Sequence, residues 1–204
     1  MRRLGPGYRF LISGYPPFLK HLLDEGDAVG FPWNEYRIHA LVGGEGMTEE
    51  LRDLLLTRFD SVYSGYGATD IEIGMAGESP VSIAVRRLAR ARPDIRAALF
   101  GDDPRLPMVF QYNPLIHYLE VNAERELVCT VSRLDLLSPR VRYDVHDQGG
   151  IVDFATVRRI LAGSATTSAG WPRRLSWPVR EARCRGRSRS RCRSCGSTAG
   201  AMRP

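Results

Sequence analysis

Residues 36–68 contain a strand pattern, a glycine-rich turn, a helix pattern and a second strand pattern, and this order restricts the fold more than any other feature. Residues 36–42, YRIHALV, read as a strand that runs directly into Gly43-Gly44-Glu45-Gly46. Thr48 is a good N-cap residue for the helix that follows. The apolar stripe expected on the buried face of that helix is Leu51, Leu54, Leu55 and Phe59. A strand, a helix and a strand of these lengths form a parallel pair, so the sequence predicts an α/β fold.

The second strand of this unit leads into residues 61–74, SVYSGYGATDIEIG, where we expect a glycine turn at Gly65-Tyr66-Gly67. Glycine lets the backbone turn and approach a ligand closely, and the ring of Tyr66 can act as a flat platform. Thr69 offers a hydroxyl to a phosphate, and Asp70 offers an oxygen ligand to magnesium. Ligands of such folds bind at the carboxyl ends of the strands, so this turn and the turn at residues 43–45 are expected on one edge. A plainer interpretation is a glycine turn that only ends a strand.

Helix and strand patterns continue through the rest of the body. A strand at residues 8–14 precedes a helix that Pro16-Pro17 opens and Gly26 ends, and Ser79-Pro80 opens another helix that Pro93 ends. The arginines of that second helix are expected on a solvated face: Arg86, Arg87, Arg90 and Arg92. Strands are expected at residues 108–112, 116–121, 126–131 and 140–145, followed by a helix that starts at Asp153. His117 is expected to be an exposed strand residue.

Charge is divided unevenly along the chain. Residues 1–163 contain 19 basic and 22 acidic side chains, whereas residues 164–204 contain ten arginines and a single acidic residue, Glu181. We therefore divide the chain into an α/β part at residues 1–107, a β-rich part at residues 108–163, and an arginine-rich tail at residues 164–204.

The tail lacks sustained periodicity and has few residues that could build a core, which predicts a disordered segment or an out-of-frame translation of GC-rich DNA. One alternative is a nucleic-acid-binding arm, because serine- and arginine-rich runs neutralise phosphates. Another is half of a zinc site at Cys184, Cys192 and Cys195, although zinc usually takes four ligands. We favour the out-of-frame interpretation over both and do not expect a nucleic-acid partner.

Apolar runs are short throughout the sequence. Met1-Arg2-Arg3 is basic, but Pro6 and Gly7 interrupt the apolar residues that follow before a signal-peptide core can form. No run approaches the length of a membrane span, and the cysteines are not spread through the body as a disulfide framework requires. The sequence predicts a cytoplasmic protein with no membrane partner.

The order of these motifs resembles the second half of the large N-terminal domain of adenylate-forming enzymes. The matching segments are LVGGEGMTEELRDLLLTRF, VYSGYGATDIEIG, ELVCTV and VRYDVHD, and the resemblance covers residues 8–162. It is greatest to the phenylacetate-CoA ligase branch and related acyl-CoA synthetases. The glycine turn, the Gly-Tyr-Gly segment and the aspartate occur in the family's order, about 20 and about 75 residues apart. The resemblance implies a partial α/β adenylation domain with a small β-rich part.

In that family a carboxylate attacks the α-phosphate of ATP to form an acyl-adenylate, and coenzyme A then takes the acyl group. The resemblance implies ATP with Mg²⁺ as cofactors, and a carboxylic acid and CoA as substrates. It assigns Gly43, Gly44 and Glu45 to the border of the adenine. Tyr66, with Gly67 beside it, would pack on the base, and Asp147 would accept hydrogen bonds from the ribose hydroxyls. Thr69 and Asp70 would contact phosphate and magnesium as the catalytic pair.

The sequence also departs from the family pattern. Asp70 stands where the family usually has glutamate, and Val145-His146 precede Asp147 where threonine and glycine are usual. We find no phosphate-binding loop before Tyr8 and no lid domain with a catalytic lysine, since the single lysine is Lys20. We therefore expect a ligase fragment that binds nucleotide with little or no activity. The alternatives are a non-enzymatic nucleotide- or partner-binding remnant, and a nucleic-acid-binding protein that works through its tail.

Overall fold

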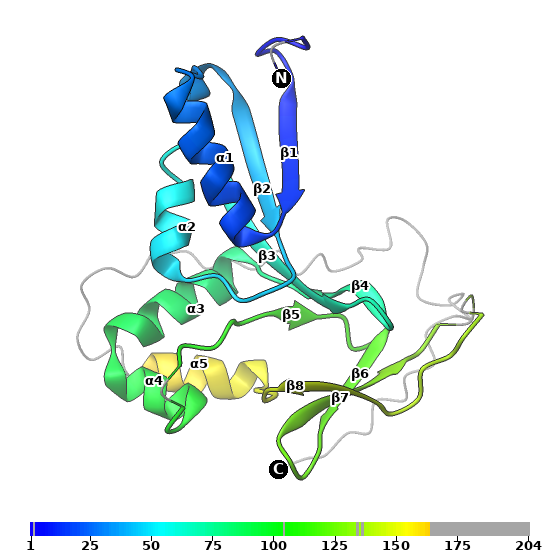
Figure 1. The fold of residues 1–204 in the computed structure, drawn as a ribbon. Coiled ribbons are helices and arrows are strands. Elements are labelled where there is room, and N and C mark those ends of the chain that lie inside the picture. The colour runs from blue at the N-terminus through cyan, green and yellow to red at the C-terminus, as the bar shows by residue number, and fades with distance from the viewer. Residues whose placement is uncertain (2, 104, 134, 136, 164–204) are drawn as a thin grey trace, which may run out of the picture. The chain divides into compact units, whose positions relative to one another are not determined.

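A computed structural model describes residues 1, 3–103, 105–133, 135 and 137–163, and Figure 1 shows these residues in two β-sheets and five helices. One sheet has the order β1 (Arg9–Gly14), β2 (Arg37–Val42), β3 (Ser61–Ala68), β4 (Glu72–Gly77) and β5 (Gln111–Tyr112). The other has the order β6 (His117–Val121), β7 (Glu126–Val131) and β8 (Tyr143–Gln148). The helices are α1 (Pro16–Ala28), α2 (Glu49–Leu55), α3 (Pro80–Ala91), α4 (Pro93–Phe100) and α5 (Phe154–Gly163). The mixed α/β fold is confirmed.

All of these elements belong to one compact unit of the chain, and β5 from the β-rich part pairs with β4 from the α/β part. Every hypothesis about residues 164–204 concerns residues outside the described ones. Within the described residues, none of the helices has the length and apolar character needed to cross a membrane.

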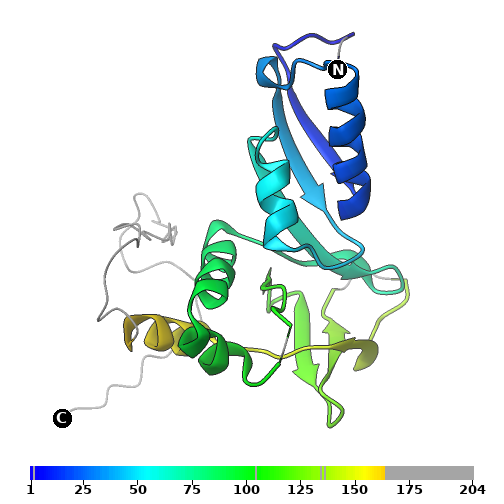
Figure 2. The same cartoon turned by 60° about the vertical axis from the view of Figure 1, so that its left-hand side comes forward.

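Strands β2 and β3 form the predicted parallel pair, with His39 opposite Ser61, and β1 adds to it in parallel, with Arg9 opposite Arg37. Helices α1 and α2 pack on one face of these strands, as Figures 1 and 2 show. Buried side chains on this face are Leu19, Leu23, Ile38, Ala40, Val42, Leu55, Phe59 and Val62. The side chain of Thr48 accepts a hydrogen bond from Leu51 N at 3.2 Å, as an N-cap should. Leu54 is the exception to the predicted stripe, because it is exposed.

The expected glycine turn at Gly65-Tyr66-Gly67 is wrong, because these residues continue β3. The first half of β3 pairs parallel with β2, and the second half pairs antiparallel with β4, with Gly65 opposite Gly77. The register shifts between Tyr66 and Ala68, which marks a bulge. Glycine inside a strand often accompanies a bulge or a close backbone approach, so these glycines serve the change of partner. The turn itself lies further on, at residues 69–71.

Gly26 does not end α1, which continues to Ala28. A Cβ atom built on Gly26 would lie 2.1 Å from Cζ2 of Trp33, so glycine is required by packing at this position. Trp33 is buried and makes edge-to-face contacts with the rings of Phe31 and Phe59. Its indole N–H donates to Asp27 Oδ1 at 2.8 Å. The missing side chain therefore makes room for the indole between α1 and the core.

We expect Gly26→Ala to destabilise the fold by about 1 to 3 kcal/mol, because the buried indole must move. Thermal unfolding should show a Tm lower by about 2 to 10 °C for a chain of this size. Gly163→Ala in α5 is the matched control, since a Cβ there meets nothing within 4 Å. Equal melting temperatures for Gly26→Ala and the wild type would contradict the packing explanation.

Helix α3 ends at Ala91, just before Pro93, as predicted, and Pro93 also begins α4, which the sequence did not predict. Two further expectations are corrected by the structure. The strand expected at residues 108–112 is reduced to β5. Arg86 is 4% exposed and pairs with Glu49, so it does not belong to a solvated face.

His117 is also buried, at 4% exposure, and so is not the exposed strand residue that its alternation suggested. Its Nε2 lies 2.7 Å from Glu72 Oε2, whose carboxylate also pairs with Arg133. The β6 to β7 hairpin with its turn after Val121 and the helix start at Asp153 agree with the sequence, since Asp153 accepts hydrogen bonds from the Thr156 backbone and hydroxyl.

Candidate functional site

Tyr66 and Asp147, which are far apart in the sequence, meet in the structure. The Tyr66 hydroxyl donates to Asp147 Oδ2 at 2.8 Å. The Tyr66 ring is half-buried and stacks on Phe110, with centroids 5.6 Å apart and planes 23° apart. Burial and the hydrogen bond to the Asp147 carboxylate raise the pKa of Tyr66, so the phenol stays protonated and acts as a donor. The arrangement presents an aromatic ring and a carboxylate side by side.

Strand alternation in β8 brings Asp147 to this position. Tyr143, Val145 and Asp147 lie on the side of β8 that faces the β3 to β4 hairpin. Val145 packs against the buried cluster of Met75, Cys129 and Val131, and burial of the Cys129 thiol raises its pKa. This apolar cluster fixes the face of β8 from which the two polar residues reach the hairpin.

Asp70 and Thr69 lie in the turn between β3 and β4, and both are exposed. The Tyr143 hydroxyl donates a hydrogen bond to Asp70 Oδ2, and Arg140 Nε donates to the Asp70 carbonyl at 2.9 Å. The hydrogen bond from Tyr143 lowers the pKa of Asp70, and the same bond raises the pKa of Tyr143. Asp70 is therefore a carboxylate that already has one partner from β8.

The β3 to β4 turn offers magnesium one suitable ligand, the Asp70 carboxylate. Magnesium is usually held by one or two carboxylates together with substrate phosphates and water. Asp70 supplies one ionised, exposed carboxylate, and the Thr69 hydroxyl precedes it in the same turn. Asp70 would be a direct ligand of the ion, and the Thr69 hydroxyl would contact a phosphate group that also binds the ion.

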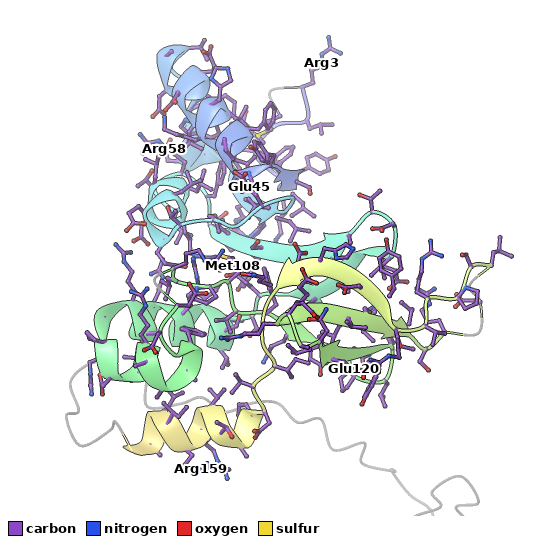
Figure 3. The ribbon with its side chains drawn as sticks, turned by 60° about the horizontal axis from the view of Figure 1, so that its bottom comes forward. Arg3, Glu45, Arg58, Met108, Glu120 and Arg159 are labelled. Atoms are coloured by element: carbon purple, nitrogen blue, oxygen red, sulfur yellow. The ribbon has the colours of Figure 1, made fainter. Side chains whose placement is uncertain are left out.

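Gly43, Gly44 and Glu45 form the loop after β2, and Glu45 is labelled in Figure 3. Gly44 has a φ of 91°, which favours glycine, and Gly43 N donates to Gly14 O at 3.2 Å. A Cβ on Gly43 would lie 3.6 Å from the carbonyl oxygen of Gly65. Gly43 and Gly65 are therefore neighbours, although Gly65 lies inside β3 and not in the second turn that was expected at this edge.

Tyr15, the N-cap residue of α1, lies beside this loop, although the sequence did not single it out. A Cβ on Gly44 would lie 3.8 Å from its ring, and the charge of Glu45 raises the pKa of Tyr15. Among the described residues, no hydrogen bond or ion pair joins Glu45 to Tyr66 or to Asp147. The structure thus brings together Tyr66 with Asp147 and Gly43 with Gly65, and it leaves Glu45 beside Tyr15.

Phe110, Tyr143 and Arg140 were missed by sequence reasoning. The alternation of Tyr143, Val145 and Asp147 is a signal that could have placed Tyr143 on the same face as Asp147. Phe110 follows no such pattern, because it precedes the two-residue strand β5 and is known as a neighbour of Tyr66 only from the fold.

The opposite face of β8 carries a second polar group. Ligand atoms of Glu126, Asp144 and His146 all lie within 4.8 Å of one another. The Asn122 side-chain amide donates to Glu126 Oε2 at 3.2 Å and to Asp144 Oδ2 at 2.9 Å. These three side chains have the chemistry of metal ligands, but Asn122 already satisfies one oxygen of each carboxylate.

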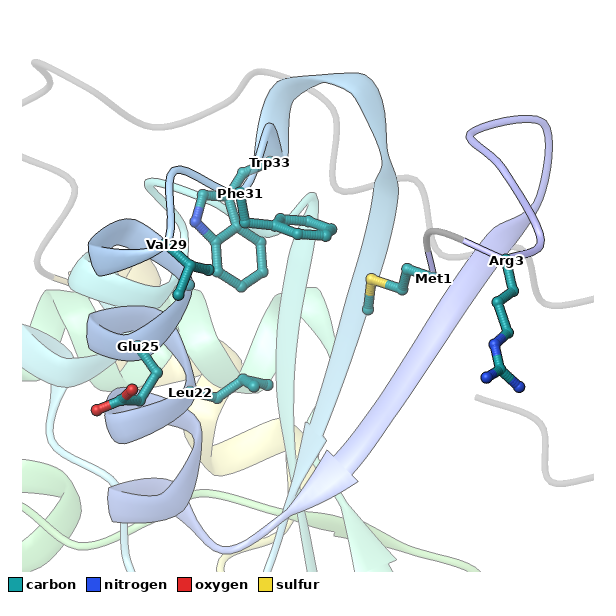
Figure 4. A pocket seen from close by; sticks show the side chains of 8 residues that line it. Met1, Arg3, Leu22, Glu25, Val29, Phe31 and Trp33 are labelled. Atoms are coloured by element: carbon teal, nitrogen blue, oxygen red, sulfur yellow. The ribbon is translucent and has the colours of Figure 1, made fainter.

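A groove of about 610 Å³ lies beside α1, away from these residues (Figure 4). Its lining is mostly apolar, with Arg3 and Glu25 as the charged members: Met1, Arg3, Leu22, Glu25, Gly26, Val29, Phe31 and Trp33. None of the sequence-predicted site residues lines it, so the groove and the Tyr66 to Asp147 site are separate features.

Comparisons with known proteins add no assignment. No protein-family model matches the chain, and no curated protein is significantly similar to it.

Proposed function

We propose that this chain binds an adenine nucleotide, with the base against Tyr66 and the ribose hydroxyls at Asp147, as a part of a carboxylate-activating ligase. The observation that carries the proposal is the 2.8 Å hydrogen bond between the Tyr66 hydroxyl and Asp147 Oδ2. It unites the two residues that the resemblance to adenylate-forming enzymes assigned to the base and the sugar. Residues so distant in sequence have no local reason to meet.

The chemistry of the two side chains supports the same ligand. An aromatic ring offers a stacking surface for a purine, and Phe110 behind Tyr66 holds that ring in place. A carboxylate is an acceptor only, so it suits a vicinal diol, which can donate two hydrogen bonds. Asp147 is exposed and so can be reached by a ligand.

Asp70 extends the proposal from the nucleoside to the phosphates. It would bind Mg²⁺ together with the α-phosphate of ATP, next to the hydroxyl of Thr69. A carboxylic acid and CoA are the co-substrates in this proposal, which takes them from the family resemblance. We propose binding without efficient adenylation, because the family uses a catalytic lysine for that step. The only lysine of this chain, Lys20, lies exposed on α1 and pairs with Asp24.

The test is thermal unfolding with and without ATP and Mg²⁺. A ligand at 100 times its Kd stabilises a fold by about 2.7 kcal/mol, which we expect to raise the Tm by about 5 to 10 °C. Asp147→Ala should abolish this rise, measured against the variant's own Tm without ligand, because the ribose hydroxyls lose their acceptor.

Asp144→Ala is the matched control, because Asp144 lies on the same strand and its side chain contacts Asn122 and His146 on the opposite face. It should retain the rise with ATP. A wild-type melting curve that ATP and Mg²⁺ leave unchanged would refute nucleotide binding.

A further inference from the structure

Two tyrosine to aspartate hydrogen bonds connect β8 to the β3 to β4 hairpin, and they run in opposite directions. Tyr66 of β3 donates to Asp147 of β8, while Tyr143 of β8 donates to Asp70 in the hairpin turn. Strand β8 therefore contributes one tyrosine donor and one carboxylate, and the β3 to β4 hairpin contributes the other tyrosine and the other carboxylate. Both carboxylates that the sequence assigned to ligands are held by the protein itself.

Of the elements joined by these two hydrogen bonds, β8 is the one that can move away from the β3 to β4 hairpin at the lowest cost. It is the last strand of the order β6-β7-β8, so β7 is its only partner among the strands that the structure describes. Its register with β7 shifts between Glu126 and Val128, and His146 has a φ of 60°, in the left-handed region that a non-glycine residue rarely adopts. An edge strand with an interrupted ladder opens at lower cost than a central one.

The Tyr66 hydroxyl and a ribose diol are donors that compete for the same acceptor. An ionised carboxylate has about four lone-pair sites on its two oxygens, and Tyr66 already uses one of those on Asp147 Oδ2. A diol that approaches both oxygens must therefore share Oδ2 with Tyr66 or displace it. The hydrogen bond also ties the Tyr66 ring to β8, while the ring's face rests on Phe110.

We propose that the Tyr66 to Asp147 hydrogen bond is a latch: it occupies part of the Asp147 carboxylate in the resting protein, and the ribose of a bound nucleotide displaces it. This inference rests on the proposed function and adds its regulation. The latch lowers the affinity of the resting protein, because nucleotide binding must break one internal hydrogen bond to an ionised group. Removing the hydroxyl while keeping the ring should therefore strengthen binding.

The experiment is a titration of the full chain with ATP and Mg²⁺, followed by calorimetry, for the wild type and Tyr66→Phe. We expect Tyr66→Phe to bind about 3- to 10-fold more tightly, the factor that a net hydrogen-bond contribution of this kind makes. Tyr63→Phe is the matched control, because it makes the same change on the same strand at a half-buried tyrosine. It should leave the Kd unchanged.

A second nucleotide separates the latch from a general change in packing. With 2′,3′-dideoxy-ATP, which has no diol to compete for Asp147, the gain of Tyr66→Phe should disappear. Equal or weaker ATP binding by Tyr66→Phe, or the same gain with both nucleotides, would overturn the latch.

A nucleotide-independent measurement keeps the two proposals distinguishable. Thermal unfolding of Tyr66→Phe, Asp147→Asn and the double variant forms a double-mutant cycle, and the latch requires the two single effects to be non-additive. If the effects are non-additive but neither the wild type nor Tyr66→Phe binds ATP, the internal hydrogen bond is established. The proposed function, and with it the competition between Tyr66 and ribose for Asp147, is then refuted. Additive effects would refute the latch whatever the binding result.

Discussion

Replacement of Arg52 by methionine is expected to lower the free energy of unfolding by about 3 to 5 kcal/mol, because it leaves the buried Glu78 carboxylate without its cation and removes one of the cations around Glu49. Arg52 is 1% exposed and lies at the centre of an ion cluster under the sheet. Its Nε donates to both oxygens of Glu49 at 3.2 and 3.1 Å, and its Nη2 donates to Glu78 Oε1 at 2.6 Å. The side chains of Glu49 and Glu78 are 1% and 0% exposed, so water cannot replace the guanidinium.

The cluster also supports the strand that carries Tyr66. Arg52 Nη1 donates to the Val62 carbonyl at 2.8 Å, and Glu78 Oε2 accepts from Ser64 N at 2.7 Å. Ser64 is the last residue of β3 that pairs with β2, immediately before the antiparallel half of the strand. Loss of Arg52 should therefore disturb the point from which β3 leads into the candidate site.

Urea unfolding followed by circular dichroism measures this effect, and thermal unfolding should show a Tm lower by about 6 to 20 °C. Arg87→Met is the control, because Arg87 contacts the same Glu49 from a half-exposed position and should cost little. A loss no larger for Arg52→Met than for Arg87→Met would show that burial does not set the cost.

The second large effect is expected for Glu49→Gln, which at neutral pH should also cost about 3 to 5 kcal/mol. Glu49 is 2% exposed and receives hydrogen bonds from Arg52, Arg86 and Arg87. Burial raises the pKa of this carboxyl, but the three guanidinium groups lower it further, so its pKa in the folded state lies below the ordinary 4.5. An amide in this place removes the carboxylate that pairs with the buried Arg86, and it leaves Arg52 with Glu78 alone.

The lowered pKa fixes the sign of the pH dependence. Below pH 4.5 the unfolded chain binds a proton at Glu49 before the folded chain does, so acid favours unfolding. The stabilisation from Glu49 is complete above that pH and is lost as the pH falls through the folded-state pKa. The difference between wild type and Glu49→Gln should therefore shrink on acidification, which urea unfolding at a series of pH values would measure.

Glu50→Gln provides the comparison for this series. Glu50 is the next residue of α2 and pairs with Arg90, but its side chain is 67% exposed, so solvent screens the pair. Its replacement should change stability little at any pH. A constant difference between wild type and Glu49→Gln from neutral to acid pH would contradict the ionised, buried state of Glu49.

Local sequence patterns were sufficient for much of the α/β unit. The alternation in residues 36–42, the cap at Thr48 and the proline-opened helix at Ser79 each depend on neighbours within one turn or one strand. The observed elements β2, α2 and α3 follow these patterns. Secondary structure of this kind is readable because its period and its end signals are local.

The same reasoning failed where a residue type has two structural uses. Gly65 and Gly67 suit a turn and a bulged strand equally, and only the pairing with β4 selects the strand. Pro93 follows the end of α3 as predicted, but it also opens α4, which was missed. Gly26 was interpreted as a helix end, whereas its role is to make room for Trp33. In each case the deciding partner lies outside the local segment.

The sequence by itself determined the α/β class, the parallel unit and the residue types at the candidate site, because these depend on local periodicity and side-chain chemistry. Tertiary structure alone decided that Arg86 is buried against Glu49, that the Tyr143 hydroxyl donates to Asp70, and that the Tyr66 hydroxyl donates to Asp147. Periodicity indicates which face of an element is buried, but it does not name the partner on that face. Hydrogen bonds and ion pairs between distant segments form only once the sheets and helices have packed, so their partners could be identified only in the folded chain.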